Sequence, residues 1–254
     1  MLKISNLTLS FRKKKVLKSL NLSLPSNGLF SIIGANGVGK TTLLRVILGS
    51  ISNYRGSIEI DNKEQTSYKK RDLAKLIAIT PQEFFPKFDF KAKEIVLMGR
   101  YPYLKIWQNF SKNDEKLVET VLSKVKMNSF AFRSFNSLSG GEKQKINIAR
   151  VLVQDTKIIL MDETLAQLDI NHQIEIISII KELSKTKLIL IVSHNINLAS
   201  EFSDELIVLK DGKVAYKGNS KTIITKQNIS HCFDIKKFEI FNNPKTKKPY
   251  IFYR

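Results

Sequence analysis

The sequence has very little cysteine and no long hydrophobic run. Its 254 residues include a single cysteine, Cys232, so no disulfide can form within the chain. The longest apolar runs, such as Lys187–Val192, fall far short of the roughly 20 residues needed to cross a hydrocarbon layer. No apolar stretch behind a basic start resembles a secretion signal. We therefore expect a cytoplasmic protein that does not itself span a membrane.

Acidic residues are scarce. The 23 Asp and Glu stand against 42 Lys and Arg, which gives a formal net charge of +19. Such a charge would suit a nucleic-acid partner if the basic residues clustered on one face. The basic residues instead lie along the whole chain, at 12–15, 69–71, 236–237 and 245–248. We predict a solvated, lysine-rich surface, which an anionic membrane face or an acidic partner would favour, and expect no nucleic acid.

The hydrophobic residues, 43% of the chain, are enough to bury a full α/β core. Alternating residues predict antiparallel strands at Leu2–Phe11 and Leu20–Leu24. Short apolar runs predict buried parallel strands at 29–33, 158–161, 188–192 and 205–209, with further strands at 56–61 and 76–80. Helical spacing predicts helices at 41–48, 115–125, 143–153 and 172–183. Asp211-Gly212 predicts a hairpin turn, and residues 242–254 have no clear period.

A glycine-rich loop follows the strand predicted at 29–33. Residues 34–41 read G-A-N-G-V-G-K-T, which fits the phosphate-binding pattern G-x-x-x-x-G-K-[ST] between a strand and a helix. Glycines let backbone N–H groups turn towards phosphates, and the following helix adds its positive end. Lys40 supplies a mobile charge and Thr41 a ligand for Mg²⁺. The predicted nucleotide-binding residues are Gly34, Ala35, Asn36, Gly37, Val38, Gly39, Lys40, Thr41 and Thr42.

Two carboxylates follow the buried strand at 158–161. Asp162 and Glu163 would lie at the C-terminal edge of a parallel sheet, where α/β proteins bind ligands. Asp162 would hold Mg²⁺ directly or through water, and Glu163 would polarise the attacking water as a general base. A cation clamp with one water-orienting carboxylate is nearly sufficient for phosphoryl transfer to water. ATP hydrolysis with Mg²⁺ is the economical inference.

A second glycine motif, L-S-G-G-E at 138–142, opens another predicted helix, with Ser139 suited to cap it. At this point the sequence resembles the ATP-binding-cassette (ABC) ATPase family, because the phosphate loop, this signature and the acidic strand occur in that family's order over nearly the whole chain. The resemblance implies that the signature serves a nucleotide held by a second copy in a homodimer. The residues assigned to it are Ser139, Gly140, Gly141 and Glu142.

The resemblance also implies roles for three residues outside these motifs. Phe11 would stack on adenine, Gln82 would contact Mg²⁺ and act near the reacting centre, and His194 would contact the γ-phosphate. Taken alone, Phe11 could be a core aromatic, Gln82 a loop residue on the surface and His194 a strand-end histidine. The sequence departs from the family pattern at Thr164-Leu165, where Pro-Thr is usual after the catalytic glutamate, and at Asn195, where aspartate is common.

Several segments are similar to the importer branch for iron chelates, haem or cobalamin. They include Met98–Leu104 with Trp107, Val153-Gln154, Leu168–Gln173 and His194–Ala199. The resemblance implies separate transmembrane permease subunits, an extracytoplasmic substrate-binding protein and a peripheral place on the inner face of the membrane. Exposed aromatics after Gly99 would suit a permease socket, although local packing is an alternative. His172 and His231 show no metal-ligand spacing with Cys232.

The predicted fold class is α/β: a P-loop NTPase core with a mixed, mainly parallel sheet and an antiparallel β subdomain, plus an inserted helical subdomain. One ABC ATPase domain would cover residues 1–254. Within it, 1–84 and 157–216 form the nucleotide-binding core, 85–156 the helical subdomain with the signature, and 217–254 a C-terminal extension. The alternatives are an ATPase of another importer or exporter, a ribosome- or nucleic-acid-associated ATPase and a non-hydrolysing regulatory cassette. The sequence contains neither a second phosphate loop nor a long heptad tract, the features that would favour the nucleic-acid class.

Overall fold

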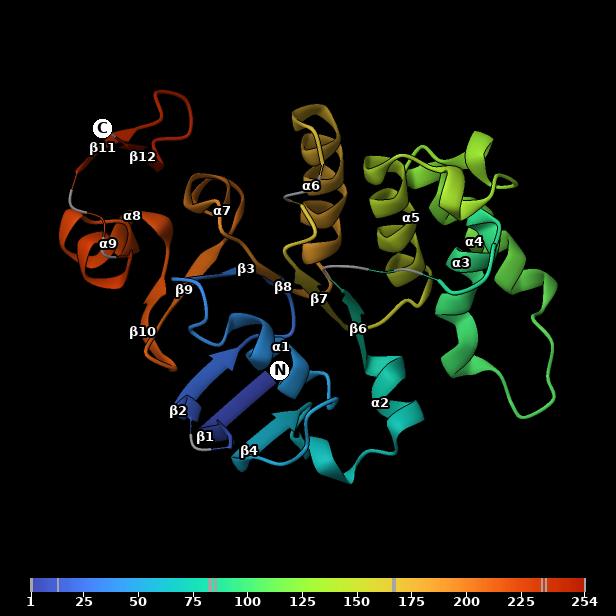
Figure 1. Ribbon diagram of the computed structural model, residues 1–254, viewed down its shortest axis with the longest axis horizontal. Helices are drawn as coiled ribbons and strands as arrows, with labels where there is room; N and C mark the ends of the chain where they lie inside the picture. The colour runs from blue at the N-terminus through green and yellow to red at the C-terminus, as the bar shows by residue number, and fades with distance from the viewer. Residues whose placement is uncertain are drawn as a thin grey trace.

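The computed structural model describes residues 2–12, 14–81, 84, 86–165, 168–233, 235 and 237–253. Figure 1 shows two sheets with helices between and around them, a helical region at one end and a small hairpin at the other. The predicted mixed α/β architecture with a mainly parallel sheet is confirmed. Among the described residues, no helix is long and apolar enough to cross a membrane.

The N-terminal strands form an antiparallel sheet in the order β2-β1-β4-β5. Their bounds are β1 Leu2–Phe11, β2 Lys14–Leu24, β4 Arg55–Ile60 and β5 Lys63–Glu64. Alternation on either side of an irregularity at Asn6, where φ is 51°, places Leu2, Ile4, Leu7 and Leu9 of β1 on the buried face. β2 begins well before the predicted Leu20, because its exposed lysines pair with the end of β1, where their charges stay in water.

The central sheet has the order β10-β9-β3-β8-β7-β6 and is parallel except for β10. Its strands are β3 Gly28–Ile33, β6 Ile77–Thr80, β7 Ile158–Asp162, β8 Leu188–Val192, β9 Glu205–Lys210 and β10 Lys213–Gly218. All residues of β7 and β8 are buried, as their unbroken apolar runs predict for strands covered on both faces. The hairpin at Asp211-Gly212 is also confirmed.

Helix α1 (Lys40–Ile47) lies between the two sheets and packs into one core with both. A second core joins the other face of the central sheet to α6 (Ile170–Ser184) and to the helical region. That region contains α3 Ala92–Leu97, η2 Met98–Tyr103, α4 Lys112–Lys124, η3 Asn128–Phe130, η4 Phe135–Ser137 and α5 Gly140–Val153. It follows η1 Gln65–Ser67 and α2 Lys70–Leu76, which precede β6.

A salt bridge inside the helical region fixes the 3₁₀ turn η2. Arg100 Nε lies 2.8 Å from Asp114 Oδ1, and each side chain is 11% exposed. Asp114 also accepts a hydrogen bond from the Ser111 hydroxyl, which caps α4, while Arg100 donates to the carbonyl oxygen of Val153 at the end of α5. These contacts tie η2 to both helices.

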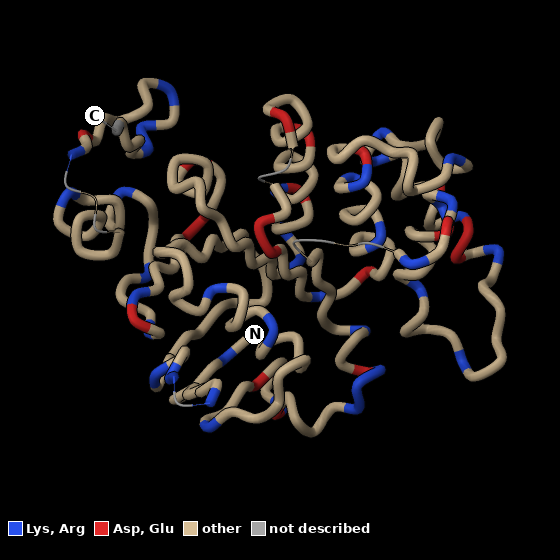
Figure 2. Tube along the Cα trace, viewed as in Figure 1, with Lys and Arg blue, Asp and Glu red and all other residues tan. Residues whose placement is uncertain are grey.

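The C-terminal part forms α7 Ile196–Phe202, α8 Ser220–Ile223, α9 Lys226–Phe233 and a hairpin of β11 Phe238–Asn242 and β12 Pro249–Tyr253. The hairpin is a separate two-stranded sheet in a segment whose sequence has no clear period. Figure 2 shows Lys and Arg spread over the N-terminal sheet, α2, the helical region and this hairpin.

Candidate functional site

The phosphate loop lies between β3 and α1, as predicted. At Gly34, where φ is +152°, an added Cβ would lie 2.4 Å from the carbonyl oxygen of Leu209 in β9. Gly39 caps α1 with a φ of 107°, a left-handed conformation that other residues adopt at a cost. Glycine is therefore required at both places, since one provides close contact with the sheet and the other turns the chain into the helix.

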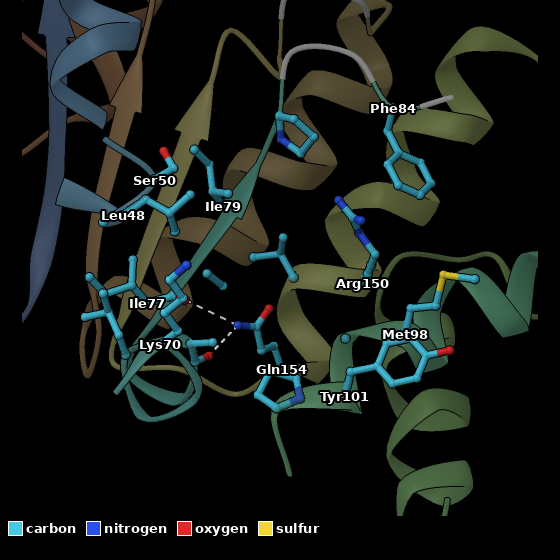
Figure 3. Close-up of a pocket in the computed structure, with 18 residues that line it drawn as sticks. Leu48, Ser50, Lys70, Ile77, Ile79, Phe84, Met98, Tyr101, Arg150 and Gln154 are labelled. Atoms are coloured by element: carbon cyan, nitrogen blue, oxygen red, sulfur yellow. Dashed lines mark hydrogen bonds between the residues drawn. The ribbon is translucent and has the colours of Figure 1, made fainter. Parts of the chain in front are cut away.

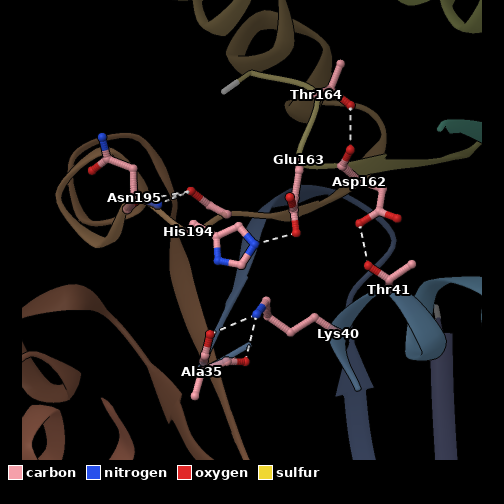
Figure 4. A network of polar contacts seen from close by, with 10 residues as sticks. Ala35, Lys40, Thr41, Asp162, Glu163, Thr164, His194 and Asn195 are labelled. Atoms are coloured by element: carbon pink, nitrogen blue, oxygen red, sulfur yellow. Dashed lines mark hydrogen bonds and ion pairs between the residues drawn. The ribbon is translucent and has the colours of Figure 1, made fainter. Parts of the chain in front are cut away.

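Lys40 is almost fully buried, at 5% exposure. Its ammonium donates hydrogen bonds to the carbonyl oxygens of Gly34, at 2.8 Å, and Ala35, at 3.0 Å (Figure 4). Burial lowers the pKa of Lys40, while the nearby carboxylates of Glu163 and Asp162 oppose this shift. The loop carbonyl oxygens therefore hold the Lys40 ammonium. When a nucleotide binds, phosphate oxygens could take the place of these carbonyl oxygens as its partners.

Thr41 and Asp162 meet across the end of the sheet. The Thr41 hydroxyl donates to Asp162 Oδ1 at 2.9 Å. Burial raises the pKa of Asp162 and the charge of Glu163 adds to it, whereas the Thr41 hydroxyl, Arg45 and Lys40 act in the opposite direction. A hydroxyl and a carboxylate side by side are the oxygen ligands that Mg²⁺ prefers beside nucleotide phosphates. This donor set fits the ion.

Glu163 and His194 form a further polar contact of the site. Glu163 has a φ of 52°, an unfavourable left-handed conformation for a residue with a side chain. Its N–H donates to the carbonyl oxygen of Val192 at 3.3 Å, and its Oε1 contacts His194 Nε2 closely (Figure 4). Because β7 and β8 are neighbours, the residues at their ends meet despite a separation of 31 positions.

Asn195, where the resemblance leads us to expect an aspartate, caps helix α7. Its Oδ1 accepts a hydrogen bond from the N–H of Leu198 at 2.9 Å. Asparagine and aspartate are similarly effective helix caps. The replacement therefore keeps the start of α7 in place beside His194 while removing one negative charge.

The segment after Glu163 is held by buried hydrogen bonds. The hydroxyls of Thr164 and Thr80 lie 2.6 Å apart, and the carbonyl oxygen of Thr164 accepts from Gln144 Nε2 at 3.0 Å. Gln173 Nε2 donates to the carbonyl oxygens of Leu165, at 2.9 Å, and Leu168, at 3.0 Å. These side chains fix the backbone in a segment where the resemblance leads us to expect a proline.

A hollow of about 460 Å³ is lined by most of the predicted nucleotide-binding residues. Phe11 reaches it from the end of β1 with 49% of its surface exposed, as a base-stacking residue requires. Val16 in β2 also lines the hollow, although no motif in the sequence marks it; its alternation with buried Leu17 is the only signal. The described lining residues are Phe11, Val16, Asn36, Gly37, Gly39, Lys40, Thr41, Thr42, Glu163 and His194.

The other predicted residues lie elsewhere. Gly34, Ala35 and Val38 belong to the loop but not to the described lining of this hollow, and Asp162 borders it only through its contact with Thr41. Gln82 lies outside the described residues. Ser139 caps α5, accepting from the N–H of Glu142 at 3.3 Å while the Glu142 carboxylate accepts from the N–H of Ser139 at 2.8 Å. The described lining includes none of the signature residues 139–142. An added Cβ at Gly140 would meet no described atom within 4 Å, so this helix start is open to an incoming group.

A second, larger hollow of about 600 Å³ lies between α2, β6, η2 and α5 (Figure 3). The side-chain amide of Gln154 joins its walls by donating to the carbonyl oxygens of Ala74, at 2.6 Å, and Ile77, at 3.3 Å. The backbone carbonyl oxygen of Gln154 accepts from the Tyr103 hydroxyl at 2.9 Å. Tyr101 is 56% exposed at the rim. This groove combines apolar walls with half-buried hydrogen bonds from Gln154.

The sequence matches the family model for the ABC transporter over residues 17–166. The chain is 34% identical to the petrobactin import ATP-binding protein FpuC of Bacillus anthracis, over 99% of this chain and 92% of that protein.

Two solved structures also resemble the fold. One is described as an inward-facing, metal-chelate type ABC transporter; it has a TM-score of 0.85 and 25% identity, over 100% of this chain and 96% of that one. The other is a dimeric ATP-binding cassette in a post-hydrolysis state with ADP and Pi. Its TM-score is 0.74 and its identity 29%, over 86% of this chain and 98% of that one.

Proposed function

Because this chain belongs to the ABC transporter family, we propose that it is the ATP-hydrolysing subunit of an importer, which powers uptake of an iron chelate, haem or cobalamin-type compound through a separate permease. The observation that carries this proposal is the convergence of Lys40, Thr41, Glu163 and His194 on one hollow at the carboxyl edge of a parallel sheet. The similarity to a petrobactin import ATP-binding protein supports the transport class.

The residues of the hollow divide the chemistry. Lys40 leaves the loop carbonyl groups for the phosphates, and Thr41 with Asp162 holds Mg²⁺, which when bound neutralises charge on the phosphates. Glu163 orients the attacking water and accepts its proton, while His194, beside Glu163, donates a hydrogen bond to the γ-phosphate. Phe11 stacks on the base. Gln82 stays a predicted contact to Mg²⁺.

Two copies would be needed for a complete site. Ser139 and Gly141 lie at an open helix start, and the described lining of their own chain's hollow does not include them. In a head-to-tail homodimer, backbone N–H groups at this start would meet the nucleotide of the partner. The dimeric cassette with ADP and Pi supports this arrangement.

The groove between α2 and α5 is the proposed docking site for the permease. It has apolar walls with exposed Tyr101 at the rim, and Trp107 and Ile106 extend from the loop after η2 with 99% and 84% exposure. Exposed aromatics beside a groove are typical of a partner surface. The subunit would then lie on the inner face of the membrane, and the permease would link it to an extracytoplasmic substrate-binding protein.

Glu163→Gln tests the chemistry directly. We expect a fall in ATP turnover of about 100-fold or more, because the water loses its base, while ATP still drives formation of a dimer on gel filtration. Lys40→Ala should instead abolish nucleotide binding and the dimer. Undiminished hydrolysis by Glu163→Gln would contradict the role of Glu163.

Uptake assays test the transport class. A deletion strain should lose uptake of one among iron chelates, haem and cobalamin, and should regain it with the wild-type gene but not with Glu163→Gln. Copurification with RNA or ribosomes in place of membrane proteins would instead favour the nucleic-acid-associated ATPase.

A further inference from the structure

The C-terminal hairpin β11–β12 lies outside the nucleotide hollow but packs on the helix that follows His194. Figure 1 shows the hairpin at the C-terminal end of the molecule and α7 nearby. Helix α7 begins at Ile196, two residues after His194. The hairpin pairs with none of the described strands of the two larger sheets. Its attachment to the rest of the protein therefore depends on side chains.

Asn197 of α7 forms a two-point contact with the backbone of β12. Its Nδ2 donates to the carbonyl oxygen of Ile251 at 2.9 Å, and its Oδ1 accepts from the N–H of the same residue at 2.7 Å. One turn later, the buried hydroxyl of Ser200 donates to the carbonyl oxygen of Pro249 at 2.8 Å. The amide thus pairs with both backbone groups of one residue, which fixes the register between helix and hairpin.

The turn of the hairpin binds the other end of α7. The Lys248 ammonium donates to the carbonyl oxygens of Glu201, at 2.7 Å, and Ser203, at 3.3 Å. The carboxylate of Glu201 accepts from the Thr246 hydroxyl at 3.0 Å. A cation at the last carbonyl groups of a helix is favourable because it opposes the negative end of the helix dipole. The hairpin therefore makes specific polar contacts at both the start and the end of α7.

Apolar residues join the same contact to the phosphate loop. Ile251 and Phe238 of the hairpin belong to a buried cluster with Ile196 of α7 and Ile33 of β3. Ile33 comes directly before Gly34, and Ile196 comes two residues after His194. The hairpin therefore completes the core beneath two chain segments that enter the nucleotide site.

Neither partner is expected to be stable alone. α7 has 7 residues, whereas isolated helices shorter than about 12–15 residues are marginal in water. A lone two-stranded hairpin is also marginal. Each therefore depends on the other, and a change in the hairpin should reach the start of α7.

We propose that the β11–β12 hairpin positions His194: through Asn197 and Lys248 it fixes α7, and so holds the imidazole against Glu163 and towards the γ-phosphate. Asn197 and Lys248 are positioning residues, since they touch neither nucleotide nor reacting atoms. The inference rests on the proposed role of His194 in ATP hydrolysis.

The test uses the full-length chain with Asn197→Ala and, separately, Lys248→Ala. We expect kcat for ATP hydrolysis to fall by about threefold to tenfold, while the KM for ATP changes less than about twofold, because the phosphate loop is unchanged. Lys248→Arg should restore most of the rate. Lys245→Ala, at an exposed position in the turn of the same hairpin, should leave kcat unchanged.

A double-mutant cycle separates positioning from general loosening. Once His194→Ala has removed the imidazole, adding Asn197→Ala should not lower kcat further, because the hairpin acts through that side chain. In ring ¹H–¹³C NMR spectra, Asn197→Ala should move the His194 signal and leave that of His172 in place. Two Ala variants with unchanged kcat, or effects that multiply in the double variant, would overturn the inference.

The same cycle keeps the two proposals distinguishable. If His194→Ala by itself leaves turnover unchanged, the proposed role of His194 fails. If His194→Ala greatly lowers turnover while Asn197→Ala and Lys248→Ala do not, only the hairpin inference fails. Thermal unfolding of each variant verifies that it is folded at the assay temperature.

Discussion

The hydroxyl oxygens of Thr80 and Thr164 lie 2.6 Å apart, and both residues are fully buried. Thr80 ends β6, and Thr164 follows the catalytic candidate Glu163 at the end of β7. The pair therefore links the strand that leads towards Gln82 to the strand that carries the acidic residues. Thr164 stands at the position where a proline is usual in the family.

This pair gives a stability prediction. Thr164→Val leaves the buried Thr80 hydroxyl without its partner and should lower the free energy of unfolding by about 1–3 kcal/mol. Replacing both residues with Val should be closer to neutral, because no unpaired hydroxyl then stays buried. Denaturant unfolding of the single and double variants measures this. If the losses of stability in the two single variants simply add in the double variant, the contact between the two hydroxyls contributes nothing.

The two capping boxes allow the structural and functional roles of Ser139 to be separated. Ser139 and Ser111 cap α5 and α4 in the same way. Replacing either with Ala should cost about 0.5–2 kcal/mol of stability. Only Ser139→Ala should also weaken the ATP-driven dimer on gel filtration and lower turnover. A similar loss of dimer in Ser111→Ala would mean that helix fraying, and not a contact in trans, explains the result.

The ionisation of Asp162 predicts a pH dependence of stability. Burial is the main cause of its raised pKa, so the folded protein holds this proton more tightly than the unfolded chain does. The contribution of protonated Asp162 to the stability of the fold is complete below the pKa that Asp162 has in the unfolded chain. It is lost as the pH rises through the pKa that Asp162 has in the folded protein. Ionised Asp162 therefore lowers the stability of the nucleotide-free protein at neutral pH.

Asp162→Asn should consequently raise the thermal unfolding midpoint of the nucleotide-free protein at pH 7, since asparagine can still accept from Thr41. The advantage over the native protein should shrink as the pH falls towards 4. ATP turnover should drop by about 100-fold, because a ligand for Mg²⁺ is lost. Calorimetry at several pH values provides the measurement, and an advantage that grows at acid pH would contradict the assignment.

Gln154 predicts a defect in coupling to the permease. Its side-chain amide, at the end of α5, donates to the carbonyl oxygens of Ala74 in α2 and Ile77 at the start of β6, beside the proposed docking groove. In a reconstituted transporter, Gln154→Leu should lower the stimulation of ATPase activity by substrate by about fivefold or more. The turnover of the isolated subunit should change much less. Gln227→Leu, an exposed position in α9, is the matched control; an equal fall in the isolated subunit's turnover would exclude a coupling role.

Local patterns were sufficient for most of the secondary structure. The alternation of β1, the apolar runs of β7 and β8 and the glycine loop before α1 follow from side-chain period and turn chemistry within a few neighbouring residues. Helices α4 and α5 begin earlier than predicted, because the capping serines Ser111 and Ser139 precede the first apolar positions. The hairpin at the C-terminus had no such signal, since its buried residues face a core formed by distant segments.

The sequence by itself determined that this chain has a phosphate loop, a strand ending in Asp162-Glu163 and a capped signature helix, because each depends on adjacent residues. Only the tertiary structure decided that His194 meets Glu163, that Thr80 meets Thr164 and that Asn197 and Lys248 bind the C-terminal hairpin. These contacts depend on the order of strands in the central sheet and on the packing of α7. Strand order and helix packing are set by the cooperative burial of the whole core, which no short stretch of sequence specifies.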